Sequence, residues 1–215
     1  MWNFSPLVSG KMPRFTEKAE IAGTFNSNAV LPYGLTVDGV RTVIERTHQL
    51  LTDLNKFLVG WNYGRLEEML PGNAFAGFLS NVVVTNIEAL KGQLVRNRKV
   101  GGHPDLVPAG RYPDNAILRG KEGLEVKVSK QRGGWQGHNP EAGWHTIFVY
   151  NIDAETLPIE NREPTSVSMV LAAELREKDW SFSGRKGTSR RTITASVVVS
   201  GMEKLRANWV YKVEK

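Results

Sequence analysis

The chain has 215 residues, of which 40% are hydrophobic and 23% are charged, a composition typical of a globular protein and not of a disordered or fibrous one. The absence of cysteine excludes disulfides, thiol catalysis and Cys-ligated zinc, and no apolar run is long enough to span a membrane. The formal net charge of +6 suggests an anionic partner. We expect an intracellular protein with no membrane contact.

This charge is unevenly distributed along the chain. Residues 91–132 carry ten Lys or Arg and four Asp or Glu, and residues 181–215 carry eight and two. Each segment therefore has a balance of +6, whereas the rest of the chain has a balance of −6. Two basic segments indicate contact with a polyanion, although ordinary solvated surface charge can give the same pattern.

The N-terminal part predicts an irregular arm followed by a helix. Residues 1–35 mix Pro, Gly and Asn with scattered aromatic residues and show no sustained periodicity. From residue 38 to residue 58 the apolar side chains recur every three or four positions, which predicts an amphipathic helix. Thr36 or Asp38 can cap the start of this helix, and Gly60 ends it.

A second helix, capped by Asn73, is predicted from residue 75 to residue 90. Beyond it the chain changes to short apolar segments separated by turns, which is typical of strands. Residues 116–119 and 124–128 predict a hairpin around the turn at 120–123. Further strands are expected at residues 145–150 and 167–175, although the second also fits a helix. Residue 182 is expected to pair with the segment 190–199 around a turn at 184–187, and a helical turn is expected at residues 202–206.

These elements indicate a single domain of the α+β class (α/β in the loose sense). We divide it into an N-terminal arm and helical region at 1–72, a core at 73–180 and a basic hairpin tail at 181–215. The amphipathic helix near residues 38–59 is a candidate dimer interface, although a core-packing role explains its apolar stripe as well.

One stretch of the core has a pattern with chemical meaning. In a strand over residues 124–128 alternate side chains share a face, so Glu125 and Lys127 point away from the core together. A second carboxylate is available upstream, because Asp105 and Asp114 each follow a proline. Two carboxylates bind a hard divalent cation through oxygen, and a neighbouring lysine can orient water and stabilise charge on phosphorus. The pattern predicts metal-assisted phosphodiester hydrolysis.

A Pro-Asp pair followed by Glu-x-Lys on a strand resembles the PD-(D/E)xK nuclease superfamily, over roughly residues 73–150. The resemblance implies a restriction-endonuclease-like mixed sheet flanked by helices, so that residues 73–180 would be the nuclease core. It also implies Mg²⁺ as the cofactor, with Mn²⁺ able to substitute, double-stranded DNA as the partner and a homodimer. We therefore expect a cytoplasmic protein of a prokaryote or phage.

The family pattern can be carried over residue by residue. Glu125 becomes a metal ligand and Lys127 becomes the catalytic lysine. Spacing favours Asp105 as the other ligand, because its 20 positions before Glu125 leave room for a strand and a return loop. Asp114 remains the alternative, and Glu88 on the second predicted helix is an additional candidate ligand.

Residues near the motif and in the tail are predicted to bind DNA. The loop after the motif strand is rich in glycine, amide and aromatic groups, which can approach phosphates and read bases. A plain surface loop whose tryptophan packs for stability explains it equally well. Basic residues in the tail can grip the phosphate backbone. The candidates are Lys130, Gln131, Arg132, Trp135, Gln136, His138, Asn139, Arg185, Lys186, Arg190 and Arg191.

The sequence thus predicts a Mg²⁺-dependent DNA endonuclease of the type II restriction-enzyme kind. A non-catalytic DNA-binding or DNA-sensing module of the same fold remains an alternative. Glu125 and Lys127 can also be an ordinary ion pair on an exposed strand face with no catalytic role. An RNA-binding protein is a further alternative, because Gly184–Gly187 has the GxxG spacing of KH loops. His138 and His145 without cysteine make a weak case for zinc.

Overall fold

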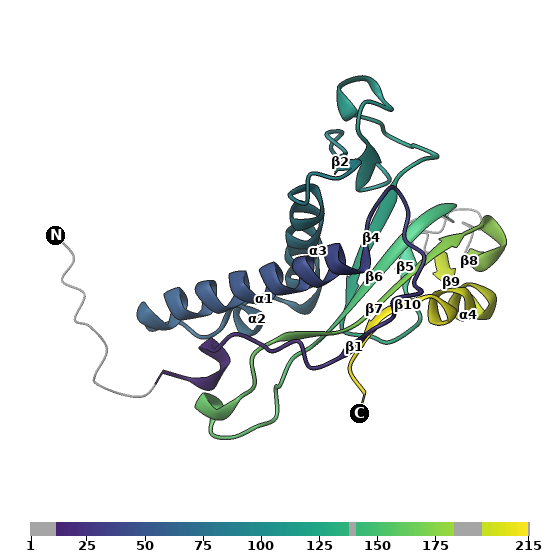
Figure 1. The fold of residues 1–215 in the computed structure, drawn as a ribbon. Helices are drawn as coiled ribbons and strands as arrows, with labels where there is room; N and C mark the ends of the chain where they lie inside the picture. The colour runs from purple at the N-terminus through teal and green to yellow at the C-terminus, as the bar shows by residue number, and fades with distance from the viewer. Residues whose placement is uncertain (1–11, 138–140, 183–194, 215) are drawn as a thin grey trace, which may run out of the picture.

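The computed structural model of the protein describes residues 12–137, 141–182 and 195–214. In these residues the fold is mixed α+β, with a seven-stranded sheet, a three-stranded sheet and four α-helices. Helices α1 and α3 pack on one side of the large sheet, whereas α4 and the small sheet lie on the other (Figure 1). None of the described helices is long and apolar enough to cross a membrane.

The large sheet takes strands from both ends of the described chain. Its order is β1-β10-β7-β6-β4-β3-β2, and all neighbours are antiparallel except β4 and β6, which are parallel. The sequence regions 1–72, 73–180 and 181–215 therefore share one sheet. The strands are β1 (Thr24–Phe25), β2 (Leu94–Arg96), β3 (Leu106–Pro108), β4 (Leu124–Ser129), β6 (Gly143–Asn151), β7 (Ser166–Leu175) and β10 (Trp209–Lys212).

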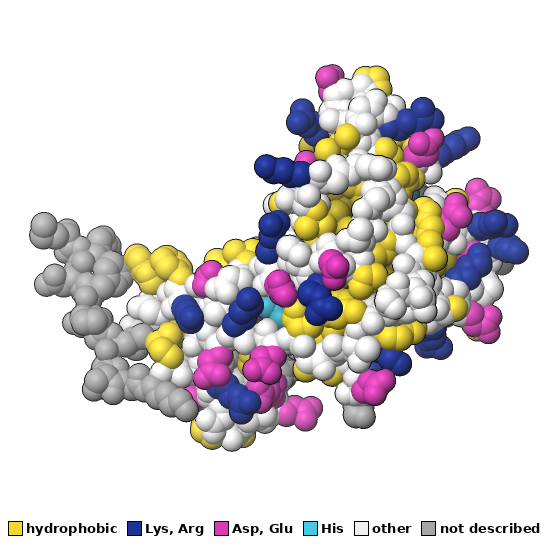
Figure 2. All heavy atoms as spheres, viewed as in Figure 1, with side chains coloured by type: hydrophobic (Ala, Val, Ile, Leu, Met, Phe, Trp, Pro, Cys, Tyr) yellow, Lys and Arg dark blue, Asp and Glu magenta, His cyan; other side chains and the backbone are white. Residues whose placement is uncertain are grey.

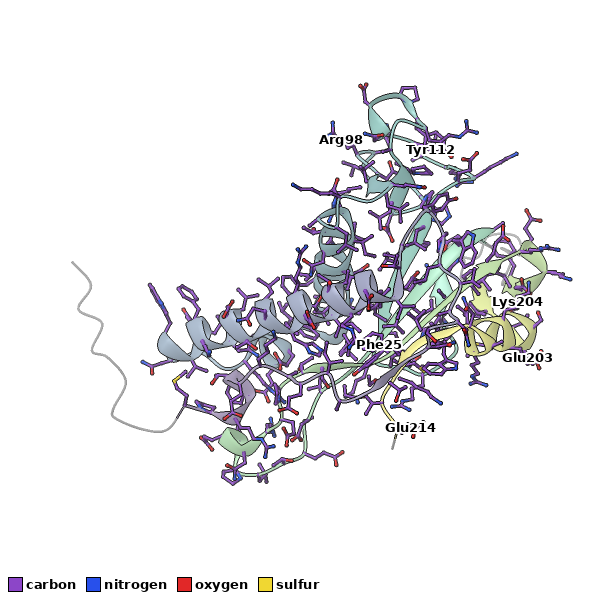
Figure 3. The ribbon with its side chains drawn as sticks, in the orientation of Figure 1. Phe25, Arg98, Tyr112, Glu203, Lys204 and Glu214 are labelled. Carbon is purple, nitrogen blue, oxygen red and sulfur yellow. The ribbon has the colours of Figure 1, made fainter. Side chains whose placement is uncertain are left out.

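The small sheet has the order β5-β9-β8, from β5 (Gln136–Gly137), β8 (Trp180–Phe182) and β9 (Ala195–Val197). The pairing of Phe182 with Ala195 confirms, for the described residues, the predicted contact of residue 182 with the segment 190–199. Helix α4 (Val199–Ala207) is longer than the predicted turn. It is fixed to the sheet because Lys204, labelled on α4 in Figure 3, binds the buried carboxylate of Asp179.

Helix α1 (Val37–Gly60) forms as its periodicity predicts, and its cap is Thr36, whose Oγ1 accepts a hydrogen bond from Gly39 N at 3.0 Å. Its end near Trp61 exposes several large apolar side chains. The face toward the sheet buries Val40, Val43, Ile44 and Leu51, and the exposed set is Phe57, Trp61 and Tyr63.

Helix α2 (Leu66–Met69) leads into α3 (Gly72–Glu88). The prediction that Asn73 caps α3 is wrong, because the helix begins one residue earlier and Pro71 takes the cap position. The Asn73 side chain instead accepts a hydrogen bond from the next backbone N–H. Short 3₁₀ turns complete the described elements: η1 (Arg14–Thr16), η2 (Pro113–Asn115), η3 (Ile159–Asn161) and η4 (Glu177–Asp179).

Two hydrophobic cores flank the large sheet, since alternate residues of each strand point to opposite faces. The core under α1 and α3 contains Leu124 and Val126 of β4. The core toward α4 contains Ile147 of β6 together with Trp135. Glu125 and Lys127 alternate with the first set, so the predicted strand face exists as the sequence pattern indicates.

The predicted hairpin of residues 116–119 with 124–128 is wrong. The antiparallel neighbour of β4 is β3, which pairs with it at Leu106, and residues 116–119 belong to no described strand. Asn97 gives the physical reason. Its side-chain amide donates to the carbonyl of Ile117 and accepts from the N–H of the same residue, which fixes this segment over the 97–104 loop and away from β4.

Residues 91–123 form a lobe, here called the basic lobe, which carries β2, β3 and η2 at the top of Figure 1. The segment contains seven Lys or Arg and three Asp or Glu. Arg98 and Tyr112 lie in it (Figure 3), and the Tyr112 hydroxyl accepts a hydrogen bond from Glu122 N at 3.1 Å. On the face in Figure 2, Lys and Arg side chains border this lobe on both sides.

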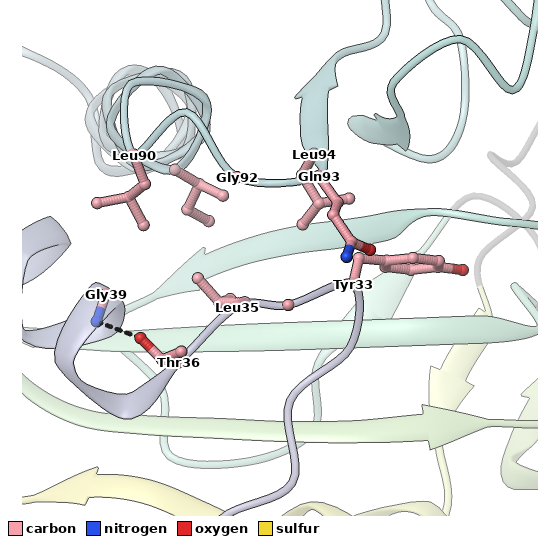
Figure 4. A pocket seen from close by; sticks show the side chains of 10 residues that line it. Tyr33, Leu35, Thr36, Gly39, Leu90, Gly92, Gln93 and Leu94 are labelled. Carbon is pink, nitrogen blue, oxygen red and sulfur yellow. Dashed lines mark hydrogen bonds between the residues drawn. The ribbon is translucent and has the colours of Figure 1, made fainter.

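A separate pocket of about 230 Å³ lies between the start of α1 and the end of α3 (Figure 4). Its lining includes Tyr33, Leu35, Leu90 and Gln93. No carboxylate, lysine or histidine lines it, so it offers none of the groups that commonly bind a metal, and the hydroxyl of its Tyr33 accepts a hydrogen bond from Gly123 N.

His48 on α1 predicts a pH dependence of stability. Its Nδ1 donates to Ala19 O at 2.9 Å and its Nε2 accepts from Val167 N at 2.9 Å, so the buried ring is neutral. Burial lowers the pKa of His48 to about 4. Between about pH 6.5 and 4 the unfolded chain binds more protons at this residue, so its contribution to stability is lost as the pH falls through that window.

As the pH falls from 7 to 5, protonation of His48 in the unfolded chain should lower the free energy of unfolding by about 2 kcal/mol. Urea unfolding of the wild type and of His48→Gln at both pH values measures the effect. The variant should lose about 2 kcal/mol less than the wild type over the same interval. An equal pH dependence of both proteins would contradict this role of His48.

Candidate active site

Strand β4 is separated from its neighbour β3 immediately after the two strands meet. They pair at Leu106, where a Cβ on Gly123 would lie only 2.2 Å from the Leu106 carbonyl oxygen, so the close approach requires glycine. Beyond this point side chains satisfy the edge of β4. Asp105 Oδ2 accepts from Val126 N at 2.9 Å, and Ser80 Oγ on α3 donates to Val126 O at 3.3 Å. The opening places the Asp105 carboxylate beside the motif strand.

Glu125 and Lys127 are joined to further polar groups at this opening. Glu125 Oε1 lies 3.1 Å from Lys127 Nζ, and its Oε2 lies 2.8 Å from His103 Nδ1. Lys127 Nζ also lies 3.0 Å from Glu141 Oε2, which in turn is 3.7 Å from His145 Nε2. The segment before β3 thus brings His103 and Asp105 to the strand that carries the motif, and the segment before β6 brings Glu141.

The two motif carboxylates have shifted pKa values of opposite sign. Burial acts to raise the pKa of Glu125, but the hydrogen bond with His103 and the charge of Lys127 hold it at about 2. Burial and the negative charge of Glu125 raise the pKa of Asp105 to about 6. Both groups are therefore ionised at neutral pH, and Asp105 is ionised at a cost that a bound cation would offset.

Lys127 remains a cation in this site. Burial acts to lower the pKa of its ammonium group, but the charges of Glu125 and Glu141 raise it above its ordinary value. A lysine in this state can stabilise negative charge and orient water, and it is a poor general base.

Two grooves meet at the cluster of polar side chains formed by His103, Asp105, Glu125, Lys127 and Glu141. One, of about 700 Å³, runs between α3 and the end of β4 and is lined in part by Lys127. The other, of about 540 Å³, is lined by His103 and Glu141 together with Arg119 and Arg176. The cluster is therefore reached from both sides, which suits an extended substrate better than a small enclosed one.

The structure separates the candidate metal ligands. Asp105 accepts a hydrogen bond from Val126 N and is affected by the charge of Glu125, which favours the spacing argument for this residue, but it is not one of the three residues, His103, Glu125 and Glu141, whose ligand atoms lie within 4.8 Å of one another. Asp114 is exposed in η2 of the basic lobe and forms no part of the described carboxylate cluster. Glu88 is also outside it, because its Oε1 accepts a hydrogen bond from Arg96 N at 3.1 Å and ties α3 to β2. Neither Asp114 nor Glu88 is placed to share a cation with Glu125.

The predicted DNA contacts divide into three groups. Trp135 is 4% exposed and donates its ring N–H to Gln131 O, so it packs in the core and offers no face for stacking on a base. Four candidates of the same loop are exposed: Lys130, Gln131, Arg132 and Gln136. The remaining candidates lie outside the described residues: His138, Asn139, Arg185, Lys186, Arg190 and Arg191.

Sequence reasoning assigned no role to His103 or Glu141. His103 stands two positions before Asp105, but the chain bends at residues 104–105 and β3 begins only at Leu106, so strand alternation does not predict its place. Glu141 carries no sequence signal either, because the parallel pairing of Glu125 with His145 brings it near the motif and sequence does not reveal that register.

Comparison of the chain with protein-family models finds no match, and comparison with curated proteins finds no match either.

Proposed function

We propose that this protein is a metal-dependent DNA endonuclease with a restriction-endonuclease-like core. The observation that carries the proposal is the convergence of Asp105, Glu125 and Lys127 where β4 separates from β3. Two carboxylates and a protonated lysine at one strand edge are the groups that phosphodiester hydrolysis with a divalent cation needs.

The residues present fit Mg²⁺. Asp105 and Glu125 offer the oxygen ligands that this ion prefers, and it commonly binds proteins through one or two carboxylates while retaining several waters. Burial and, second, the charge of Glu125 raise the pKa of Asp105, and a bound cation would offset both effects. When bound, Mg²⁺ lowers the pKa of a coordinated water and neutralises charge on phosphate. Mn²⁺ has similar oxygen chemistry and should substitute.

The chain's own groups would then position the reactants. Asp105 and Glu125 would hold the cation, and the Asp105 carboxylate is itself oriented by the hydrogen bond that it accepts from Val126 N. Lys127 Nζ, fixed between Glu125 and Glu141, would stabilise the negative charge that develops on the phosphate and orient the attacking water.

Double-stranded DNA is the proposed substrate. The basic lobe lies next to the cluster, and the exposed Lys130 and Arg132 follow directly from β4. Positive side chains on both sides of a cleavage site neutralise phosphates of a continuous backbone. A homodimer would present two such sites to opposite strands, and the exposed Phe57 at the end of α1 is its proposed contact, since large apolar surface groups favour association.

The test is cleavage of supercoiled plasmid by the full chain in Mg²⁺, in Mn²⁺ and in EDTA. We expect nicked or linear products with either cation and none in EDTA. Binding of DNA without cleavage under any of these conditions would overturn the nuclease and favour the non-catalytic DNA-binding alternative. Preferential binding of RNA would favour the third hypothesis.

A further inference from the structure

The structure brings a histidine and two glutamates together beside the proposed catalytic groups. One ligand atom from each of His103, Glu125 and Glu141 lies within 4.8 Å of the other two. The three side chains are 26%, 14% and 13% exposed, so the cluster is screened from bulk water but open to the groove that His103 and Glu141 line. They come from three segments that meet only in the folded chain.

The charges at this place do not balance. Asp105, Glu125 and Glu141 contribute three carboxylates, whereas Lys127 and a protonated His103 together contribute two positive charges, so one negative charge remains among these residues. A second cation would therefore be attracted even with Lys127 in place, because partly desolvated charges interact strongly.

His145 supplies an independent indication. Its side chain is 1% exposed, and its Nδ1 donates to Gly143 O at 3.0 Å because a carbonyl can only accept. In the neutral ring Nε2 then carries a free lone pair, and no described residue hydrogen-bonds to it. This atom faces Glu141 Oε2 at 3.7 Å. Two acceptors that face each other in a buried place are unfavourable unless a cation or a polarised water lies between them.

We propose that His103, Glu125 and Glu141 form a second cation site, next to the Asp105–Glu125 site, which binds a transition-metal ion such as Mn²⁺ in preference to Mg²⁺. The imidazole nitrogen sets this preference, because Mg²⁺ selects oxygen ligands whereas transition metals accept nitrogen. His145 Nε2, which faces Glu141 Oε2 at 3.7 Å, would complete the site through a water bound to the ion.

The geometry is suited to such an ion. Adjacent ligands of an octahedral ion with bonds of about 2.1 Å lie roughly 3.0 Å apart. His103 Nδ1 and Glu125 Oε2 are separated by 2.8 Å in the hydrogen bond that joins them, so an ion bound to both atoms would displace the proton of Nδ1. Lys127 contacts the other oxygen of Glu125, Oε1, so Oε2 is the atom that the ion and His103 would share.

The test measures Mn²⁺ binding to the full chain without DNA, by calorimetry and by the electron paramagnetic resonance signal of free Mn²⁺. We expect the wild type to bind two Mn²⁺ ions. His103→Ala and Glu141→Gln should each lose one of them or bind it at least about 10-fold more weakly. Mg²⁺ affinity should change much less in His103→Ala, and Asp105→Asn should lose the other ion.

Glu174→Gln is the matched control, since Glu174 lines the same groove as Glu141 but is exposed and outside the cluster. Wild-type Mn²⁺ stoichiometry and affinity in both His103→Ala and Glu141→Gln would overturn the second site. That result would leave the proposed nuclease intact. Conversely, loss of one ion in these variants of a chain that never cuts DNA would support the site and contradict the nuclease.

Discussion

Replacement of Lys127 by alanine is expected to lower the rate of Mg²⁺-dependent DNA cleavage by at least about 100-fold, the usual cost of removing one group that stabilises transition-state charge. The ammonium group lies 3.1 Å from Glu125 and 3.0 Å from Glu141, so it is held in place before substrate arrives. Single-turnover cleavage of plasmid at saturating Mg²⁺ measures the effect.

Two further variants separate catalysis from folding. Lys127→Arg keeps a cation between the two carboxylates, so it should retain stability, yet its planar guanidinium cannot reproduce the point charge of lysine and the rate should stay low. Lys56→Ala removes an exposed lysine of α1 and should cut at the wild-type rate. Cleavage by Lys127→Ala within about threefold of the wild type would remove this residue from the mechanism.

Asp105→Asn should abolish metal-dependent cleavage, whereas Asp114→Asn should leave it within about twofold of the wild type. The amide oxygen of asparagine can still accept the hydrogen bond from Val126 N, so the substitution removes the charge and leaves the local structure in place. Asp114 is exposed in the basic lobe and serves as the matched control. Equal loss in both variants, or loss in Asp114→Asn alone, would assign the ligand differently.

Asp105→Asn should abolish cleavage, yet without metal it should make the fold more stable. Because the folded-state pKa of Asp105 is raised to about 6, the folded protein binds more protons at this group between about pH 4 and 6. Stability from this group therefore falls as the pH rises through that window, and the penalty is fully present at pH 8. We expect metal-free Asp105→Asn to be about 3 kcal/mol more stable than the wild type at pH 8. Urea unfolding in EDTA tests this, and a less stable variant would contradict it.

The parts of the fold that sequence predicts are those fixed by local pattern. The stripe of α1 and the Thr36 cap are local, and the alternation of Glu125 and Lys127 in β4 follows from the two-residue period of a strand. Glu125 and Lys127, two of the three residues that carry the proposal, share this property, whereas Asp105 reaches them through the pairing of β3 with β4.

The parts that sequence misses depend on contacts between distant segments. The turn at 120–123 looked like a hairpin turn, but the long-range hydrogen bonds of Asn97 decide where residues 116–119 lie. Glu141 reaches the site through the parallel register of β4 and β6, which local pattern does not specify. Glu88 looked suitable as a helical ligand, yet its carboxylate is used to hold β2.

The position of β10 in the large sheet has a consequence for the order in which the protein can be built. β10 lies between β1 and β7, so Thr24, in the first described strand, pairs with Lys212, which the ribosome adds much later than the other strands of this sheet. During synthesis β1 has no strand to join, and the apolar edge of β7 stays open until Trp209–Lys212 emerges. Completion of the sheet is therefore a late event, and nascent chains that stop before β10 present an unpaired strand edge to their neighbours.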